Sequence, residues 1–225
     1  MRRVPYAETD LVVGLFTAER GLASALARGA RRSARRFPAL EPMHLLRVTF
    51  DERPSSELGT LLEAEIARSR LALTGDLDRL DAAGVALRWV RRAAPPHTPE
   101  PALWTEINAL LDGLDAKTLD APPKTLLAES GLRLLAAIGW GLDLERCVVC
   151  GKPCEGSSAA YIDAARGGLV CRSCGGGTMV LRSDRRLALA AAAAGEATTH
   201  LEEDDAAVAL ELVESALAAH AGVEA

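Results

Sequence analysis

The first seventy residues contain short apolar stretches separated by turn signals. Apolar stretches at 11–16 and 22–28 flank the segment TAERG, whose Gly21 suits a tight hairpin connection. A third strand-like stretch, MHLLRVTF, covers residues 43–50 and leads into turn-rich sequence. The segment at 58–71 is ambiguous, because its Leu, Glu and Ala content favours a helix whereas the neighbouring strands favour a closing strand.

From about residue 75 the hydrophobic period becomes that of helices. The predicted helical segments are 76–92, 102–114, 122–140, about 180–195 and 202–221. Asp76 is placed to cap the first of them, and Pro122-Pro123 opens the third, where proline suits the first turn. A proline-rich linker follows the first helix, and a block of cysteines separates the third from the fourth.

This order of elements predicts an α+β protein. A few short strands with hairpin turns fit a small closed barrel, because closure removes sheet edges that a minimal sheet could not protect. We therefore expect an OB-fold β-barrel at residues 1–70, followed by an α-helical domain at residues 71–225. The helical domain carries a cysteine-bearing insertion at about residues 145–177.

Composition places the chain among globular proteins, since 225 residues that are 49% hydrophobic can bury a core. No apolar run approaches the roughly 20 residues that span a bilayer, and the N-terminus lacks the apolar core of a secretory signal. We expect a cytoplasmic protein with no membrane partner. Phosphate-binding glycine loops and a nucleophile elbow are absent from the sequence and its four histidines are scattered, so no enzymatic activity is predicted.

All five cysteines lie in one short block, unlike the spread framework of a disulfide-stapled secreted domain. Cys147 and Cys150, with Cys171 and Cys174, have the spacing of a four-cysteine zinc site, and a glycine that allows a left-handed turn follows each pair. Cys154 lacks this symmetry and stays outside the predicted ligand set. We expect one structural zinc ion that stabilises a loop-rich excursion with little core of its own. A degenerate, metal-free site and a redox or catalytic role are the alternatives.

Charge is strongly partitioned along the chain. Residues 1–36 hold eight arginines against three acidic residues, a local balance of +5, so the remainder carries −10 and the whole chain −5. Five of these arginines form a cluster: Arg28, Arg31, Arg32, Arg35 and Arg36. They would share one face of a helix, but Gly29 argues against a regular helix and an arginine-rich loop fits equally well. Arginine binds phosphate bidentately and stacks on bases, which favours nucleic-acid contact; a solvated loop without a partner is the alternative.

Taken in order, these features resemble the RecO family of bacterial recombination mediators. The resemblance rests on RRVPYAETDLVV, LFTAERGLASALARGARRSARRF, LEPMHLL, the helical body and DLERCVVCGKP with the later cysteine pair, and it covers almost the whole chain. Ala7 departs from the pattern, because relatives commonly have glycine there. Relatives also usually have several more residues ahead of RRVPY, so the first strand of the barrel is expected to be shorter or the start of the chain to be assigned differently.

The resemblance implies an N-terminal OB-fold, an α-helical domain with a zinc-binding insertion, and a non-enzymatic role in recombinational DNA repair. It also implies binding of single- and double-stranded DNA, annealing of complementary strands, contact with SSB, and action with RecR in loading RecA. A cytoplasmic, nucleoid-associated location follows. The implied DNA-contact residues are Arg3, Arg28, Arg31, Arg32, Arg35 and Arg36, and the implied metal ligands are Cys147, Cys150, Cys171 and Cys174. A zinc-containing RNA-binding module without annealing activity and a thiol redox or metal-dependent enzyme are the competing hypotheses.

Overall fold

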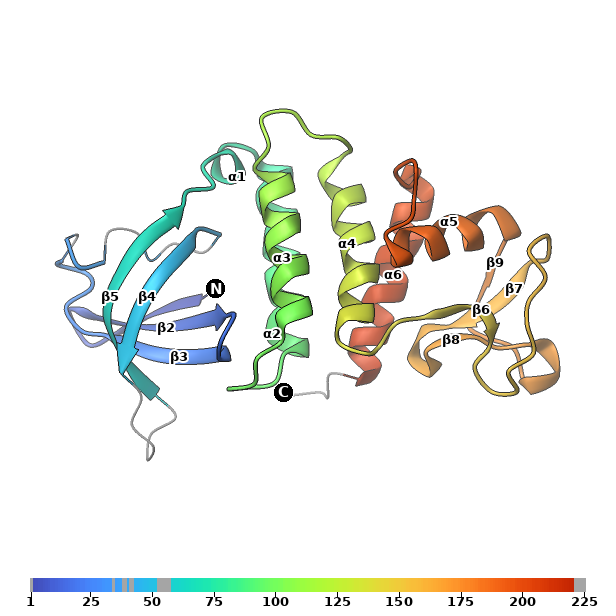
Figure 1. Ribbon diagram of the computed structural model, residues 1–225, viewed down its shortest axis with the longest axis horizontal. Helices are drawn as coiled ribbons and strands as arrows, with labels where there is room; N and C mark the ends of the chain where they lie inside the picture. The colour runs from blue at the N-terminus through green and yellow to red at the C-terminus, as the bar shows by residue number, and fades with distance from the viewer. Residues whose placement is uncertain (1, 34, 38–39, 41–42, 52–57, 221–225) are drawn as a thin grey trace.

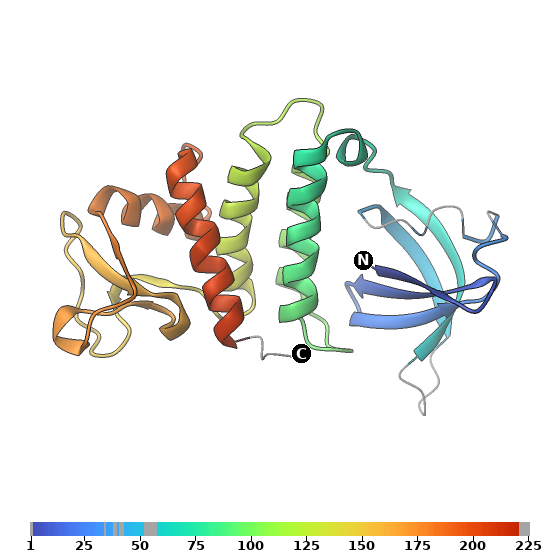
Figure 2. The ribbon, with the colours of Figure 1, turned by 180° about the vertical axis from the view of Figure 1, so that it is seen from behind.

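The structure is a computed structural model, and it describes residues 2–33, 35–37, 40, 43–51 and 58–220. A β-domain, a helical body and a small second sheet follow one another along the longest axis of the molecule (Figure 1). The view from behind shows the same order, with the last helix running beside the helical body (Figure 2). The predicted α+β class is therefore confirmed.

The β-domain is a five-stranded sheet with the strand order β1-β2-β3-β5-β4. Its strands are β1 (Arg2–Tyr6), β2 (Asp10–Thr17), β3 (Gly21–Ala27), β4 (Leu45–Asp51) and β5 (Leu58–Arg68). β3 pairs with β5 in parallel, and the other neighbouring strands pair antiparallel. A five-stranded, partly open barrel is the form of the OB-fold. Among the described strands no ladder joins β1 to β4, so the expected closure of the barrel is not completed there.

β5 settles the ambiguous segment at 58–71 in favour of a strand. Leu61 and Ala64 are buried in the core of the β-domain, whereas Glu63 and Glu65 are exposed. β5 pairs with both β3 and β4, so the sheet satisfies its backbone groups and overrides the local preference for a helix.

The helical body follows the sequence pattern closely. The described helices are α1 (Ala72–Gly75), α2 (Leu77–Ala93), α3 (Pro101–Leu114), α4 (Pro123–Ala137), α5 (Ser183–Ala194) and α6 (Glu203–His220). Asp76 caps α2 as predicted, because its Oδ1 accepts the N–H groups of Asp78 and Arg79 at 3.0 and 3.1 Å. α3 and α4 begin at prolines. Proline suits the first position of a helix, because the N–H that it lacks has no partner within the helix there. No helix in the described part of the chain has the length and apolarity that a membrane crossing requires.

The cysteine-bearing insertion contains its own sheet, with the order β6-β8-β7-β9. Its elements are β6 (Asp143–Cys147), β7 (Ala160–Asp163), β8 (Gly168–Leu169) and β9 (Met179–Leu181), with 3₁₀ helices η1 (Ala164–Arg166) and η2 (Arg172–Cys174). Short strands replace part of the loops expected in this insertion. Its buried residues Ile162, Leu169 and Leu181 belong to the core of the helices, so the insertion has little core of its own, as expected. The helix expected from about residue 180 begins later, at Ser183, because β9 pairs with β7.

A buried arginine joins the β-domain to the helical body. The side chain of Arg70 is 2% exposed, and its guanidinium donates to Oδ1 of Asp112 at 2.8 Å and of Asn108 at 2.9 Å, both on α3. It also donates to the carbonyl of Met43 on the β-domain side at 2.9 Å. We call this group of four residues the domain joint.

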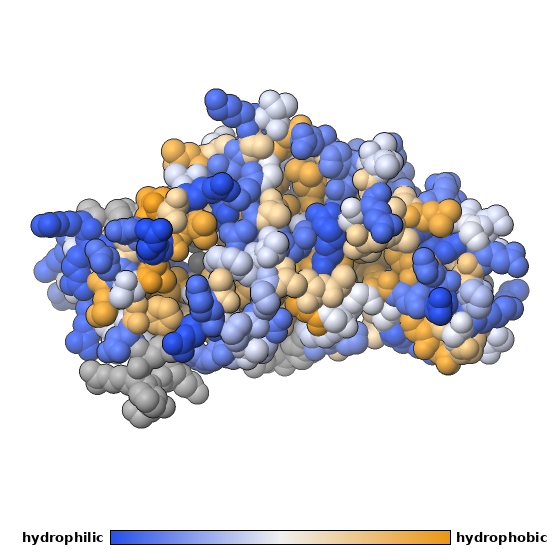
Figure 3. All heavy atoms as spheres, viewed as in Figure 1, coloured by the Kyte–Doolittle hydropathy of each residue, from blue (hydrophilic) through white to orange (hydrophobic). Residues whose placement is uncertain are grey.

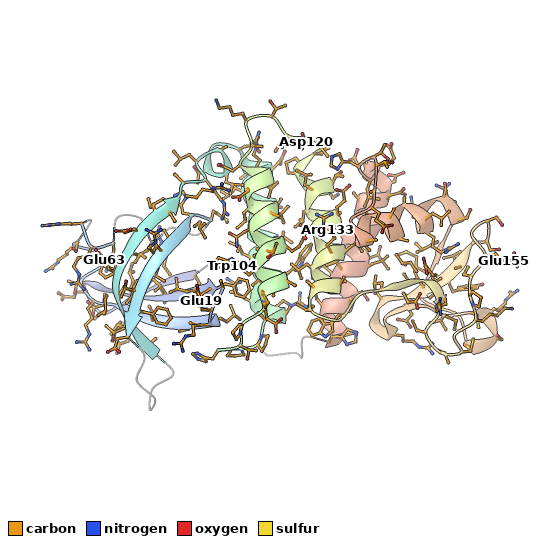
Figure 4. All side chains as sticks on the ribbon, in the orientation of Figure 1. Glu19, Glu63, Trp104, Asp120, Arg133 and Glu155 are labelled. Carbon is orange, nitrogen blue, oxygen red and sulfur yellow. The ribbon has the colours of Figure 1, made fainter. Side chains whose placement is uncertain are left out.

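Aromatic packing lies beside the domain joint. The ring centroids of Phe16 on β2 and Trp104 on α3 are 5.7 Å apart. A cavity of about 380 Å³ opens between the two domains and is lined in part by Trp104 and Glu19, which lie where β-domain and helices face each other (Figure 4). The two domains therefore meet through direct side-chain packing.

Candidate nucleic-acid interface and metal centre

The four predicted cysteine ligands come together in the insertion. The Sγ atoms of Cys147, Cys150, Cys171 and Cys174 all lie within 4.8 Å of one another. A tetrahedral zinc ion with Zn–S bonds of about 2.3 Å holds its sulfur ligands about 3.8 Å apart. The Sγ atoms of Cys150 and Cys171 are 3.7 Å apart. The four thiols could therefore bind a metal ion.

Two tight turns present these thiols, as the glycine spacing predicted. Gly151 follows Cys150 with φ +71°, and Gly175 follows Cys174 with φ +105°, both in the left-handed region that glycine adopts without strain. The N–H of Gly151 donates to the carbonyl of Cys147 at 2.8 Å and closes the first turn.

Hydrogen bonds within the cluster separate the pKa values of the thiols. The N–H of Cys171 donates to Sγ of Cys147 at 3.3 Å and, with the N–H of Cys150, lowers the pKa of Cys147 to about 6. The Ser173 hydroxyl, 3.1 Å from Sγ of Cys171, lowers the pKa of that thiol. Hydrogen bonding to the neighbouring sulfurs, Cys171 first, raises the pKa of Cys174 to about 12. The lowered pKa values of Cys147 and Cys171 suit ligation, because the thiolate is the form that binds metal.

Cys154 lies apart from the four-thiol cluster, as expected. Its Sγ is 3.7 Å from the carbonyl oxygen of Glu155 and 4.0 Å from that of Ser158. The four-thiol group found among the described residues does not include it.

Sequence reasoning missed Arg186, which supports the insertion from α5. Its guanidinium is buried and donates to the carbonyls of Leu144 and Glu155, each at 2.8 Å. These partners are 42 and 31 residues away in the chain. No local pattern could have distinguished Arg186 from an ordinary arginine on a helix surface.

The clustered arginines lie on a loop between β3 and β4. We call residues 28–37, which the structure describes except for residue 34, the arginine loop. Gly29 has φ +68° and turns follow it, so the loop is the form found and the helical face is not. All five side chains are exposed, and hydrophilic residues gather over this end of the molecule (Figure 3).

Two of the five arginines also contact the β-domain. Arg31 donates to the carbonyl of Glu8 at 3.0 Å, and Arg36 donates to the carbonyl of Leu62 at 3.3 Å. The guanidinium of Arg36 also lies 5.1 Å from the ring centroid of Phe37, which is buried in the core of the β-domain. Both ends of the arginine loop are therefore tied to the sheet.

The remaining arginines are placed differently. Within the described part of the chain, the structure gives the side chains of Arg32 and Arg35 no hydrogen bond or ion pair. Arg3 is exposed on β1, where it lies opposite Val13 of β2. This position is three residue pairs from the end of the ladder at which Tyr6 lies opposite Asp10. The structure thus groups the five loop arginines and leaves Arg3 further along the sheet.

The fold and the site define a two-domain α+β protein that joins a five-stranded β-domain to a helical domain with a four-cysteine insertion. Two family models match this chain: "Recombination protein O N terminal" over residues 1–70 and "Recombination protein O C terminal" over residues 74–224. The chain therefore belongs to the RecO family of DNA repair proteins, which are non-catalytic recombination mediators.

Individual relatives agree with the family models. The DNA repair protein RecO of Anaeromyxobacter dehalogenans (strain 2CP-C) is 40% identical over 227 residues, covering 100% of this chain and 84% of the relative. RecO of Anaeromyxobacter sp. (strain K) is 42% identical over 179 residues, covering 79% of this chain and 68% of the relative. RecO of Myxococcus xanthus is 38% identical over 173 residues, covering 76% of this chain and 68% of the relative.

Proposed function

We propose that this protein binds single- and double-stranded DNA, anneals complementary strands and helps load RecA onto single-stranded DNA coated with SSB. RecR and SSB are its proposed protein partners, and the cytoplasm, at the nucleoid, is its proposed location. Membership of the RecO family supports this function. The observation that carries it is the arginine loop, where five exposed arginines lie on a loop tied to the β-domain.

We assign a separate role to each of the two domains. Residues 1–70 are the proposed DNA-binding domain and residues 71–225 the helical domain. The proposed DNA contacts are Arg3, Arg28, Arg31, Arg32, Arg35 and Arg36. Residues beyond 36 carry a balance of −10, so their field repels phosphates and leaves the basic end of the molecule as the favoured contact.

Annealing needs no chemical step from the protein. Two DNA strands repel each other through their phosphates, and arginines that neutralise phosphates on both strands lower this repulsion. Complementary bases can then meet, and base pairing supplies the specificity. The arginine loop needs only to bind the backbone, so its binding is expected to be largely independent of sequence.

We propose zinc as the ion held by the four-thiol cluster, in a structural role. Four cysteine ligands complete a tetrahedral site, whereas a catalytic zinc keeps one position open for water. The ion would tie Cys147, at the end of β6, to the turn that contains Cys171 and Cys174. Its chemistry there is that of a crosslink between two segments of the insertion.

The test of the proposed function is annealing of complementary oligonucleotides, naked or coated with SSB, across a salt series. For wild type we expect faster annealing and a log–log salt slope of about −3 to −4, the value for roughly four to six phosphates neutralised on single strands. Changing Arg31, Arg32, Arg35 and Arg36 together to alanine should remove the acceleration. It should also flatten the slope by about 2 to 3.

A matched control removes four exposed arginines outside the β-domain: Arg88, Arg91, Arg146 and Arg166. It changes the net charge equally and should keep most of the annealing rate. Because Arg31 and Arg36 also contact the β-domain, the double variant Arg32→Ala/Arg35→Ala separates DNA contact from folding. Annealing at the wild-type rate by the fourfold loop variant, or a preference for structured RNA over complementary DNA, would overturn the proposed function.

A further inference from the structure

The turn between β1 and β2, together with the first residue of β2, holds the base of the arginine loop at three points. Oδ1 of Asp10 accepts the N–H of Gly29 at 2.8 Å. The carbonyl of Thr9 accepts the N–H of Arg31 at 3.0 Å, and the carbonyl of Glu8 accepts the guanidinium of Arg31 at 3.0 Å. Two of these three acceptors are backbone groups, so Asp10 is the one whose side chain can be changed to test the connection.

The carboxylate of Asp10 is suited to this connection. Its Oδ1 also accepts the Thr9 hydroxyl at 2.9 Å, and Arg28 lies near enough for charge attraction. The Gly29 N–H, then Thr9 and Arg28, lower the pKa of Asp10 below its ordinary value of 3.8. Asp10 is therefore ionised at neutral pH and remains a strong hydrogen-bond acceptor.

Gly29 lies two residues after the end of β3, where the chain turns. Its φ of +68° lies in the left-handed region, and the bond to Asp10 fixes the peptide group that enters this turn. The direction taken by the next residues, Arg31 and Arg32, follows from the turn. The carboxylate of Asp10 therefore binds the chain at the turn that precedes Arg31 and Arg32, although Asp10 carries the wrong charge to contact DNA.

We propose that Asp10 is a positioning residue that holds the arginine loop in the form that binds DNA phosphates. This inference rests on the proposed function. An anchored loop keeps its arginines together before DNA arrives, so binding costs less backbone and side-chain entropy. A loop without the anchor has the same arginines but must order them during binding.

The direction of the change in DNA affinity distinguishes a positioning role of Asp10 from a simple effect of its charge. Asp10 and Glu8 both carry one negative charge beside the arginine loop, so removing either charge should strengthen attraction to DNA. Among the described residues, no hydrogen bond is made to the exposed side chain of Glu8, and Glu8 contacts Arg31 through its backbone carbonyl. Glu8→Ala is therefore the matched control for Asp10→Ala.

The experiment measures the Kd of each variant for single-stranded oligonucleotides by fluorescence anisotropy. Glu8→Ala should bind as tightly as wild type or more tightly, whereas Asp10→Ala should bind about threefold to tenfold more weakly. Asp10→Asn should recover most of the affinity, because its amide oxygen can still accept the Gly29 N–H. Amide hydrogen exchange at Gly29 and Arg31 should accelerate in Asp10→Ala and stay unchanged in Glu8→Ala.

The outcomes distinguish this inference from the proposed function. If the fourfold arginine variant loses DNA binding but Asp10→Ala behaves like Glu8→Ala, the positioning role is wrong and the proposed function stands. If the fourfold arginine variant keeps full binding, both fail, because the loop then makes no contact that Asp10 could position. Weaker binding by Asp10→Ala without faster exchange at Gly29 would also overturn the positioning role.

Discussion

Gly131 occupies a position on α4 where no side chain fits. A Cβ atom there would lie 2.8 Å from Cζ3 of Trp89 and 3.1 Å from Cγ2 of Val213. Trp89 is 1% exposed, and its indole N–H donates to Oε1 of Glu214 at 2.5 Å. Packing and this hydrogen bond both hold the ring, so α2, α4 and α6 approach each other closely only because residue 131 is glycine.

We predict that Gly131→Ala destabilises the protein by up to about 2 kcal/mol net, because an overpacking cost of about 1–3 kcal/mol outweighs the gain of about 1 kcal/mol that alanine brings to a helix. Gly84→Ala on α2 is the control, since its Cβ would meet only Nη1 of Arg88 at 3.7 Å. That change should stabilise by up to about 1 kcal/mol. Urea unfolding measures both, and effects of the same sign would refute the close approach at Gly131.

The distance along the chain between interacting residues decided which site residues could be predicted. Each cysteine pair is closed by its own turn, so the spacing and the following glycine were sufficient to identify Cys147 and Cys150. The family resemblance leads one to expect glycine at position 7, and the φ of +54° at Ala7 is a conformation that glycine favours. Asp10 was missed because its partner Gly29 is 19 residues away. Nothing in the sequence next to Asp10 indicates that its carboxylate accepts a hydrogen bond from Gly29.

Among the elements, helices were predicted better than strands. The helical period of α2, α3, α4 and α6, the Asp76 cap of α2 and the prolines that open α3 and α4 are local features of the sequence. β5 and β9, in contrast, depend on partner strands elsewhere in the chain. The sequence pattern predicts the start of a helix where β9 lies and loops where the sheet of the insertion lies. Short strands of two to five residues carry too few positions to show an alternating pattern.

Packing of the insertion against the helices limits how much of the structure should depend on the metal ion. Ile162, Leu169 and Leu181 pack into the core of the helical domain without help from an ion. β6, which ends at Cys147, is an edge strand of this sheet, and residues 171–174 follow β8, so the four-thiol cluster lies between these two segments. We therefore expect the ion to stabilise the edge of the insertion and not the fold of the whole domain.

We predict one zinc ion per chain by elemental analysis, lost in Cys174→Ser and retained in Cys154→Ser. Stripping the ion with a chelator should lower the Tm and accelerate amide exchange around the cysteine pairs, while the helical circular dichroism stays nearly unchanged. Loss of the metal in Cys154→Ser would contradict the ligand set. Collapse of the helical signal on chelation would contradict the packing of the insertion into the helical core without help from the ion.

At the scale of the whole molecule, the arginine loop and the cysteine-bearing insertion lie at opposite ends, with the helices between them (Figure 1). The position of the basic end relative to the rest therefore depends on the contact between β-domain and helical body. The domain joint is the polar part of that contact. It places the guanidinium of Arg70 where water cannot replace a lost partner.

We predict that Asp112→Ala costs about 3 kcal/mol of stability, because it leaves the buried charge of Arg70 without its carboxylate. Asp112 also pairs with Arg68, but that arginine is 57% exposed and water can replace the contact. Glu65→Ala is the control, since it breaks a pair with Arg47 in which both side chains are more than half exposed, worth less than about 1 kcal/mol.

Scanning calorimetry should resolve the difference between these two variants. With the domain joint intact, we expect the β-domain and the helical body to unfold together; in Asp112→Ala the β-domain should unfold at a lower temperature than the helices. DNA affinity at low temperature should change little, because the arginine loop and its anchors lie within the β-domain. Equal costs for Asp112→Ala and Glu65→Ala, with a single transition in both, would show that apolar packing around Phe16 and Trp104 holds the domains together without the joint.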